Sequence, residues 1–301
     1  MNKNYKEIFF DQGYVPNLKI FDKTYADNIY NEYLNFNHQN NNKKCDLVEH
    51  KTKTHLYFPW ANKIIFEQKI LDVVTQIIGD DILCWNSLIF HKKANSKSWV
   101  SMHQDQNYWG IDDNKVLTVS LALSSSTVEN GCLKLLPESH KKKFEHKDLN
   151  DSNNLLARGQ TIDYKKDKIE GNFVNIVSEP GECVFFHSNM VHGSYQNNTS
   201  KDRVLYAMRF LTPDNMIDKK LYYNYATLIH GNNLEKNFIL EPTLEKSSLQ
   251  NLRKLHKKII IMQFAKYLKL KVKFSIIVSF FMVFFTYDFF RSIFYSIIKK
   301  T

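Results

Sequence analysis

Two short segments of the chain carry residues that could bind a metal ion together. In "MHQDQNYWG", His103 stands two residues before Asp105, and "FFHSNMVHGSYQNNTSKDRVLYAMRF" contains His187 and His192 followed by Arg203. Alternate residues of a strand point to the same face, so His103 and Asp105 could aim at one point. Two ligands from one strand leave a cation in need of a third, which one of the two later histidines could supply.

Two imidazoles and one carboxylate form the facial ligand set of non-haem Fe(II) oxygenases, which leaves three coordination positions open. Zinc hydrolases favour other ligand sets or a tetrahedral arrangement, so iron is the better match. The spacing alone is weak evidence, because this composition produces roughly one His-x-Asp/Glu by chance. A second pair, His146 and Asp148, lies in a Lys- and Asn-rich stretch and is interpreted as a solvated pair.

The elements that must position these residues change type along the chain. Helical periodicity is expected over 24–36 and 62–79, and Gly79 is expected to end the second helix. Short strands are expected over 82–90, 116–124, 132–136, 182–187 and 203–210. A polar stretch of about thirty residues before Gly171 is typical of an active-site flap. Helices followed by many short strands predict a mainly β fold with flanking α-helices, a sandwich or jelly roll.

The charge of the chain is confined to its end. Residues 251–301 hold eleven Lys or Arg and one acid, which accounts for the net charge of +10, so the first 250 residues are balanced. This distribution argues against a nucleic-acid partner for the folded part. The four cysteines form no Cys-x-x-Cys pair, and no secretory signal precedes the helices, so a reducing cytoplasm is expected. We predict a domain over residues 1–245 and a basic, apolar helical tail over 246–301.

The tail contains an apolar segment whose relation to a membrane is open. Its uncharged part, Phe274 to Tyr287, is fourteen residues long, short of the roughly 20 that a bilayer span needs. An extension to Ile298 includes Asp288 and Arg291, which could pair on a helix. Flanking lysines suit an anionic membrane surface, so residues 254–301 are predicted to lie on or dip into a bilayer. Packing of this helix on the domain or on a partner subunit is the alternative.

Four motifs together resemble the phytanoyl-CoA dioxygenase family of iron- and 2-oxoglutarate-dependent oxygenases. They are "MHQDQNYWG", "ENGCLKLLPESHK", "PGECVFFHSNMVHGS" and the arginine that follows, and the resemblance covers residues 21–210 in order and spacing. It implies a double-stranded β-helix, which is a cupin-like jelly roll. It also implies that His103 and Asp105 are proximal iron ligands and that His192 is the distal one. His187 could replace His192, although its apolar strand favours a packing role.

The resemblance also implies a 2-oxoglutarate site. Arg203 would bind the far carboxylate with help from Ser194, because a guanidinium takes a carboxylate bidentately, and Lys92 falls where some members place a lysine. Arg209 shares strand parity with Arg203 and could compete for this role, although distance from the distal histidine favours Arg203. Many members carry a tryptophan where this chain has Ser120, which removes one wall of the pocket.

The predicted function is therefore an Fe(II)-, 2-oxoglutarate- and O2-dependent dioxygenase that hydroxylates an aliphatic carbon. The carboxylate Asp105 favours hydroxylation, since halogenating relatives replace it with a small residue. The substrate is expected to be a small molecule or, given the tail, a lipid-like compound. The alternative is a non-catalytic jelly roll that binds a metal or ligand and is tethered to a membrane.

Overall fold

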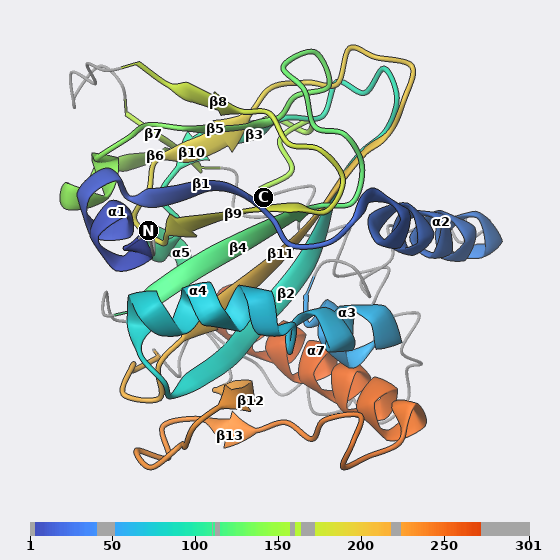
Figure 1. Cartoon of the computed structure of the whole chain (residues 1–301), viewed down its shortest axis with the longest axis vertical. Helices are drawn as coiled ribbons and strands as arrows, with labels where there is room; N and C mark the ends of the chain where they lie inside the picture. Colours follow the sequence, from blue (N-terminus) through green and yellow to red (C-terminus); the bar gives the residue numbers. More distant parts are fainter. Residues whose placement is uncertain are drawn as a thin grey trace.

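The computed structural model describes residues 4–40, 52–109, 111, 115–156, 160–163, 172–217 and 224–271. In this part of the chain, strands build two facing sheets, and helices cover the outer face of the larger sheet (Figure 1). This arrangement confirms the predicted mainly β fold, a double-stranded β-helix with flanking helices.

The larger sheet provides the platform of the fold. Its strands, in spatial order, are β1 (Tyr14–Lys19), β9 (Glu182–His187), β4 (Val116–Ala122), β11 (Arg203–Leu211), β2 (Ile82–Lys92), β12 (Tyr225–His230) and β13 (Ile239–Leu240). Neighbouring strands are antiparallel except for the pair β12 and β13. Its central strands, β4, β11 and β2, fall where alternating apolar residues predicted strands, because one face of each is buried against the helices.

The smaller sheet lies opposite this platform. Its strands, in spatial order, are β3 (Val100–His103), β10 (His192–Ser194), β5 (Leu133–Leu135) and β8 (Val174–Ile176). A separate two-stranded ribbon joins β6 (His146–Asp148) to β7 (Gln160–Ile162) within the stretch predicted as a flap. Residues 157–159 and 164–171 of that stretch lie outside the described residues.

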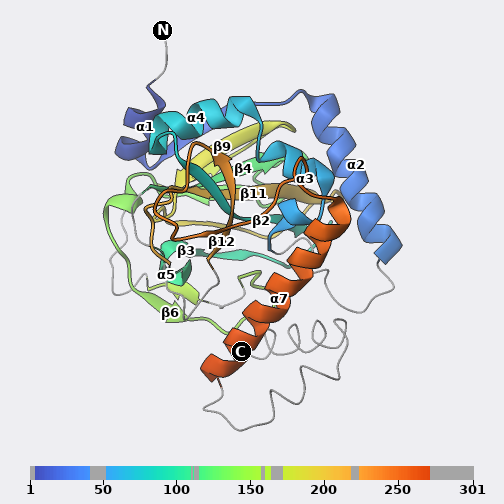
Figure 2. The ribbon, with the colours of Figure 1, turned by 90° about the horizontal axis from the view of Figure 1, so that it is seen from below.

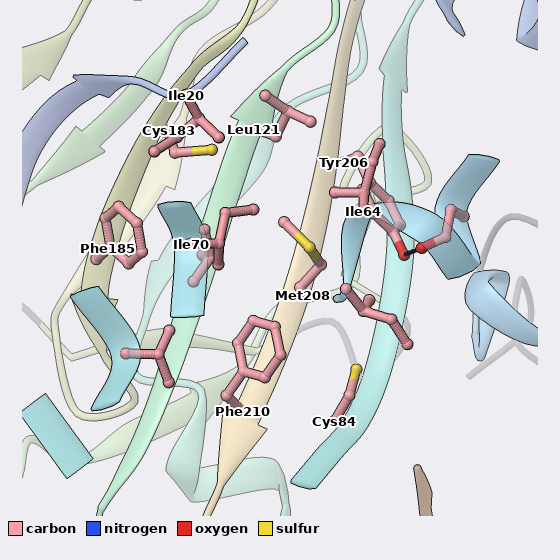
Figure 3. Packing of buried hydrophobic residues seen from close by; sticks show 14 of the residues in the cluster. Ile20, Ile64, Ile70, Cys84, Leu121, Cys183, Phe185, Tyr206, Met208 and Phe210 are labelled. Atoms are coloured by element: carbon pink, nitrogen blue, oxygen red, sulfur yellow. Dashed lines mark hydrogen bonds between the residues drawn. The ribbon is translucent and has the colours of Figure 1, made fainter. Parts of the chain in front are cut away.

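Helices pack their apolar sides on the platform. They are α1 (Tyr5–Gln12), α2 (Lys23–Asn40), α3 (Pro59–Ile64) and α4 (Gln68–Ile78), with the short α5 (Gln106–Trp109) beside the smaller sheet and two 3-10 turns, η2 (Thr54–Leu56) and η3 (Ser139–Lys141). Figure 3 shows Ile64 and Ile70 from the helices packed against Leu121, Phe185 and Met208 from the sheet, all nearly fully buried. Burial of such side chains stabilises each by about 1.5–3 kcal/mol.

The helix predicted over 62–79 is in fact two helices. Pro59 opens α3, and the chain leaves the helix after Ile64. The side chain of Glu67 then accepts a hydrogen bond from Lys69 N and caps α4, so a local side-chain contact replaces continuation of the first helix. The predicted end is confirmed, because Gly79 follows α4 and donates its N–H to Thr75 O.

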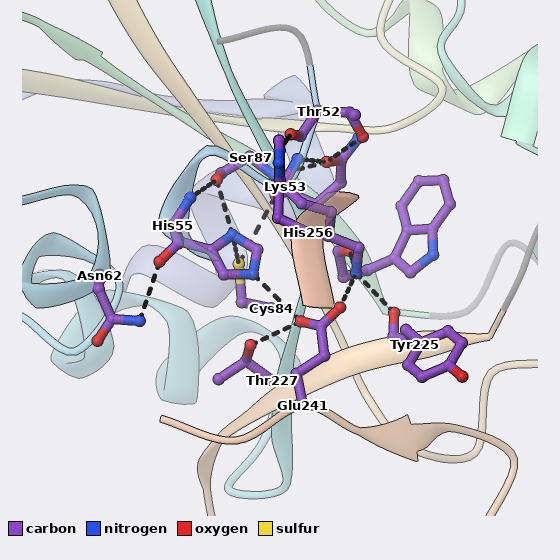
Figure 4. A network of polar contacts seen from close by, with 12 residues as sticks. Thr52, Lys53, His55, Asn62, Cys84, Ser87, Tyr225, Thr227, Glu241 and His256 are labelled. Carbon is purple, nitrogen blue, oxygen red and sulfur yellow. Dashed lines mark hydrogen bonds and ion pairs between the residues drawn. The ribbon is translucent and has the colours of Figure 1, made fainter. Parts of the chain in front are cut away.

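A buried polar network joins the C-terminal segments to the platform (Figure 4). Glu241, beside β13, lies 2.8 Å from Lys53 Nζ and accepts a 2.8 Å hydrogen bond from Thr227 of β12. His55 Nε2 lies 3.2 Å from the same carboxylate. His256 of α7 (Leu249–Lys271) contacts Thr52 O at 3.0 Å, and α7 crosses below the sheet beside η2 (Figure 2). Breaking such a network leaves buried polar groups without partners, which is costly.

The described half of the predicted tail is helical. Leu252 and Ile259 of α7 are buried against Leu56 of η2. None of the helices in the described part of the chain combines the length and apolarity that a bilayer crossing requires. The apolar segment 274–298 lies outside the described residues, so both its membrane contact and the division of the chain after residue 245 stay predictions.

Candidate metal and co-substrate site

Three potential metal ligands meet where the smaller sheet faces the platform. His103 ends β3 and His192 begins β10, and the two are directly opposed in an antiparallel pair with ring centroids 4.2 Å apart. Asp105 follows in the turn after β3 rather than on the strand itself. One ligand atom from each residue lies within 4.8 Å of the others, and all three side chains are buried. A single cation could therefore be bound by all three.

Backbone carbonyls fix how the two imidazoles present their nitrogens. His103 Nδ1 lies 2.8 Å from Ser101 O, and His192 Nδ1 lies 2.9 Å from Met190 O. A carbonyl only accepts, so each Nδ1 carries a proton and each Nε2 is the nitrogen that could bind a metal. The Nε2 atoms lie 3.4 Å and 3.8 Å from oxygens of Asp105. The ligand set thus has the chemistry of two imidazoles and one carboxylate.

The charges of these side chains suit metal binding at neutral pH. Burial alone would raise the pKa of Asp105, but the nearby Arg209 guanidinium holds it well below its usual value. Burial, reinforced by His103, lowers the pKa of His192 to about 4. The carboxylate is thus ionised and this imidazole neutral, the forms in which both bind metals.

Two buried basic side chains, called the cation pair below, lie side by side on the platform near this triad. Arg203 of β11 is directly opposite Lys92 of β2, and the two are 2% and 0% exposed. Arg203 Nη2 donates to Gly131 O at 2.9 Å, and Lys92 Nζ donates to Ser194 Oγ at 2.7 Å and to Tyr195 O. Ser194 stands two residues after His192 on β10, so this strand links the cations to the triad.

The cation pair lacks a counter-ion among the described residues. No carboxylate there lies within ion-pair distance of Arg203 or Lys92, and Arg203 Nε is buried with no hydrogen-bond partner. Burial, together with the neighbouring guanidinium, lowers the pKa of Lys92 to about 6, and burial lowers the pKa of Arg203 to about 10. Arg203 stays charged at neutral pH, and buried charges are normally paired, so the site is arranged to receive an anion.

The alternative residues weighed from the sequence lie elsewhere. His187 Nδ1 accepts a hydrogen bond from Asn189 N at 3.0 Å, and its ring packs on Phe9, so it is not part of the triad. His146 is not a solvated residue as predicted, because it lies on β6 and its Nε2 accepts from Gln104 N at 2.9 Å. Arg209 contacts Asp105 rather than joining Arg203, with 3.4 Å between Nη2 and Oδ1.

The residue between the first two ligands has a structural role that sequence reasoning missed. Gln104 Nε2 donates to Asn189 O at 2.6 Å and to Lys142 O at 2.7 Å, while its Oε1 accepts from Phe144 N. The buried amide therefore fixes the turn that carries Asp105. A glutamine whose amide forms all its hydrogen bonds within the protein has no distinctive local pattern in a sequence. Only its position between His103 and Asp105 could have drawn attention to Gln104.

The family model for phytanoyl-CoA dioxygenase matches residues 23–205, which include all three triad residues and both cations. The chain belongs to the phytanoyl-CoA dioxygenase family. This membership covers more than half of the chain and confirms the resemblance inferred from the motifs.

Curated relatives agree with this membership. A probable alpha-ketoglutarate-dependent hypophosphite dioxygenase of Stutzerimonas stutzeri is 26% identical over 162 residues, 53% of this chain and 56% of that protein. The peroxisomal phytanoyl-CoA dioxygenase of Homo sapiens is 29% identical over 153 residues, 48% of this chain and 44% of that protein. The chain thus spans about half the length of the curated relatives it matches.

Solved structures show the same fold. The apo form of ThoJ, a non-haem monooxygenase, superposes with a TM-score of 0.74 at 23% identity, covering 87% of this chain and 96% of that chain. CytC3 with Fe(II) and alpha-ketoglutarate superposes with a TM-score of 0.59 at 21% identity, covering 80% and 93%. Because both identities are below 25%, these superpositions show a shared fold alone.

Proposed function

We propose that this chain is an Fe(II)- and 2-oxoglutarate-dependent dioxygenase that hydroxylates an aliphatic carbon and produces succinate and CO2. The observation that carries this proposal is the buried triad of His103, Asp105 and His192 next to a buried cation pair that has no counter-ion in the part of the chain that the structure describes. A metal-binding module alone has no use for Arg203 and Lys92 in this place. The non-catalytic alternative is therefore less well supported.

The triad would hold the ferrous ion. Two neutral imidazoles and one carboxylate give a site of net charge +1 with Fe(II), which suits a dianionic co-substrate, and three of six positions stay open for it and for O2. When bound, this iron supplies the oxidative chemistry that couples decarboxylation of the keto acid to attack on a C–H bond. The protein orients the reactants and excludes water around them.

The cation pair would hold the far carboxylate of 2-oxoglutarate. Two residues of strand separate His192 from Ser194, about 7 Å, which is comparable to the span of a five-carbon dicarboxylate. Arg203 offers a planar fork for a carboxylate, and Ser194 and Lys92 lie beside it. An arriving dianion would also restore the ammonium charge that burial disfavours on Lys92.

The names of the relatives bear on the class of substrate. The named relatives include a hypophosphite dioxygenase, a methylphosphonate hydroxylase of Gimesia maris and phytanoyl-CoA dioxygenases, so their names span small phosphorus compounds and an acyl-CoA. We propose a small molecule or lipid-like compound. The apolar sequence of the tail favours the lipid-like choice.

The experiment is succinate formation by the full chain. Purified protein with Fe(II), O2 and 2-oxoglutarate is expected to release succinate, slowly alone and faster with the right substrate. His103→Ala and Asp105→Ala should abolish release, whereas Lys115→Met, a change at the exposed surface, should leave it intact. Full turnover in both ligand variants, or metal binding with no turnover under any condition, would contradict the proposal and favour the binding-module alternative.

We also propose that residues 254–301 contact an anionic membrane surface. In the described part of α7, Lys254 and Lys258 are exposed while Leu252 and Ile259 face the domain, so basic groups are available on the outer side. The full chain should sediment with vesicles that contain phosphatidylserine and be released by high salt. No sedimentation at low salt would rule this contact out.

A further inference from the structure

Arg209 lies on the same face of β11 as Arg203 but contacts a different group. Its Nη2 is 3.4 Å from Asp105 Oδ1, and its guanidinium lies 4.3 Å from the centre of the Trp109 ring. Trp109 in turn packs on Trp85 of β2, with 5.5 Å between ring centroids. The backbone of Arg209 is held because β11 lies between β4 and β2, and the Trp109 ring covers one face of its guanidinium.

The contact divides the two oxygens of Asp105 between different neighbours. Oδ1 faces Arg209 Nη2 and His103 Nε2, both at 3.4 Å, while Oδ2 faces His192 Nε2 at 3.8 Å. A carboxylate can give a metal one oxygen or two. A second oxygen would occupy a coordination position that a chelating co-substrate needs, so the number that Asp105 gives matters.

We propose that Arg209 is a positioning residue that reserves one oxygen of Asp105, so that this carboxylate gives the metal a single oxygen. This inference rests on the proposed function and deepens it. The planar fork of arginine holds one carboxylate oxygen in a defined direction, and stacking on Trp109 limits the ways in which the fork can turn. A lysine, with one compact ammonium on a flexible stem, would hold Asp105 less strictly.

The surroundings of Arg209 argue against a role as receptor for the co-substrate's far carboxylate. Its guanidinium already has a carboxylate partner in Asp105, 3.4 Å from Nη2, whereas Arg203 has none among the described residues. The Cα atoms of Arg203 and Arg209 are about 20 Å apart along β11, six residues at 3.3 Å each, and it is Arg203 that lies opposite Lys92. The two arginines of β11 therefore serve the metal end and the anion end of one site.

The test uses Mn(II) as probe metal on the full chain and requires no turnover. Water-proton relaxation counts the exchangeable waters on bound Mn(II), and titration gives the affinities of 2-oxoglutarate and of oxalate, a chelator with no far carboxylate. Arg209→Met should remove one exchangeable water and weaken both chelators at least ten-fold. Arg209→Lys should give intermediate values, and it covers the case in which Arg209→Met does not fold.

Two controls separate the outcomes. Arg253→Met removes another arginine that stacks on a ring, 4.5 Å from the centre of Tyr57 on the far side of the platform, and should change neither reading. Arg203→Met should weaken 2-oxoglutarate but not oxalate.

Three results would overturn the inference. If Arg209→Met weakens the affinity for 2-oxoglutarate but not for oxalate, Arg209 is a receptor for the far carboxylate. If the substitution changes neither the number of exchangeable waters nor the two affinities, Arg209 has a packing role only. If the unsubstituted protein binds no Mn(II), the proposed function fails and this inference fails with it, whereas the first two results leave the proposed function standing.

Discussion

Removal of the buried ammonium of Lys53 should destabilise the protein far more than removal of the whole ion pair. The carboxylate of Glu241 is fully buried and lies 2.8 Å from Lys53 Nζ. Burial alone would raise its pKa, but Lys53 and the bond with His55 lower the pKa of Glu241 from its ordinary value of 4.5 to about 2. That difference corresponds to about 3 kcal/mol in favour of the charged form.

Lys53→Met leaves this carboxylate in the interior with neutral donors only. Loss of one partner of a buried pair costs about 3–5 kcal/mol, which agrees with the stabilisation given by the pKa of Glu241. The double variant Lys53→Met/Glu241→Gln removes both charges, so its cost should be smaller than that of the single variant, about 1–2 kcal/mol. The stability order of the two variants is thus the diagnostic result.

Guanidinium unfolding, followed by tryptophan fluorescence and circular dichroism, gives the two free energies, and the thermal midpoint of Lys53→Met should fall by at least about 6 °C. Lys115→Met is the matched control, since Lys115 is 3.8 Å from Asp214 with both side chains about half exposed, and its effect should be under about 1 kcal/mol. The reasoning would be refuted if Lys53→Met lowered the free energy of unfolding by less than Lys115→Met does, or if the double variant were less stable than Lys53→Met.

Three further predictions concern pH, the co-substrate and the metal. Because the pKa of Glu241 is lower in the folded than in the unfolded protein, its contribution to the free energy of unfolding is present above pH 4.5 and is lost as the pH falls toward 2. Burial also lowers the pKa of His256 to about 4, so the unfolded protein takes up a proton first and stability should already decline below pH 6.5. A flat unfolding midpoint between pH 7 and 4 would contradict this. Arg203→Met should weaken 2-oxoglutarate roughly 30-fold or more with Mn(II) affinity unchanged in titration; equal losses of both would argue for misfolding. Mn(II) at a hundred times its Kd should stabilise the protein by about 2.7 kcal/mol in the same unfolding assay, and Asp105→Ala should lose this gain.

Much of the fold could be predicted from local patterns. The strands expected over 82–90, 182–187 and 203–210 correspond closely to β2, β9 and β11, because alternation of apolar side chains is a property of neighbouring residues. The helix over 62–79 was wrong in its continuity, since its periodicity does not register that Glu67 caps a new helix.

The candidate site was predicted less completely. The family motifs pointed to His103, Asp105 and His192, and the structure brings these side chains together, although their role as ligands stays a prediction. Arg209 and Gln104 were not assigned their contacts, because each contact joins segments that are far apart in the chain. Neither residue has a local signature that marks its partner.

The sequence by itself determined the positions of five strands, β2, β4, β5, β9 and β11, the charge asymmetry of the tail and the family to which the chain belongs. Only the tertiary structure separated the tasks of the two arginines on β11. Arg203 and Arg209 are an even number of residues apart and so share one face of β11. Pairing of β11 with β2 places Arg203 opposite Lys92, and packing of the smaller sheet places Arg209 beside Asp105. Which face a residue of β11 points to depends on adjacent residues, whereas Lys92 and Asp105 belong to segments about a hundred residues away, so only the folded sheets could bring them beside the two arginines.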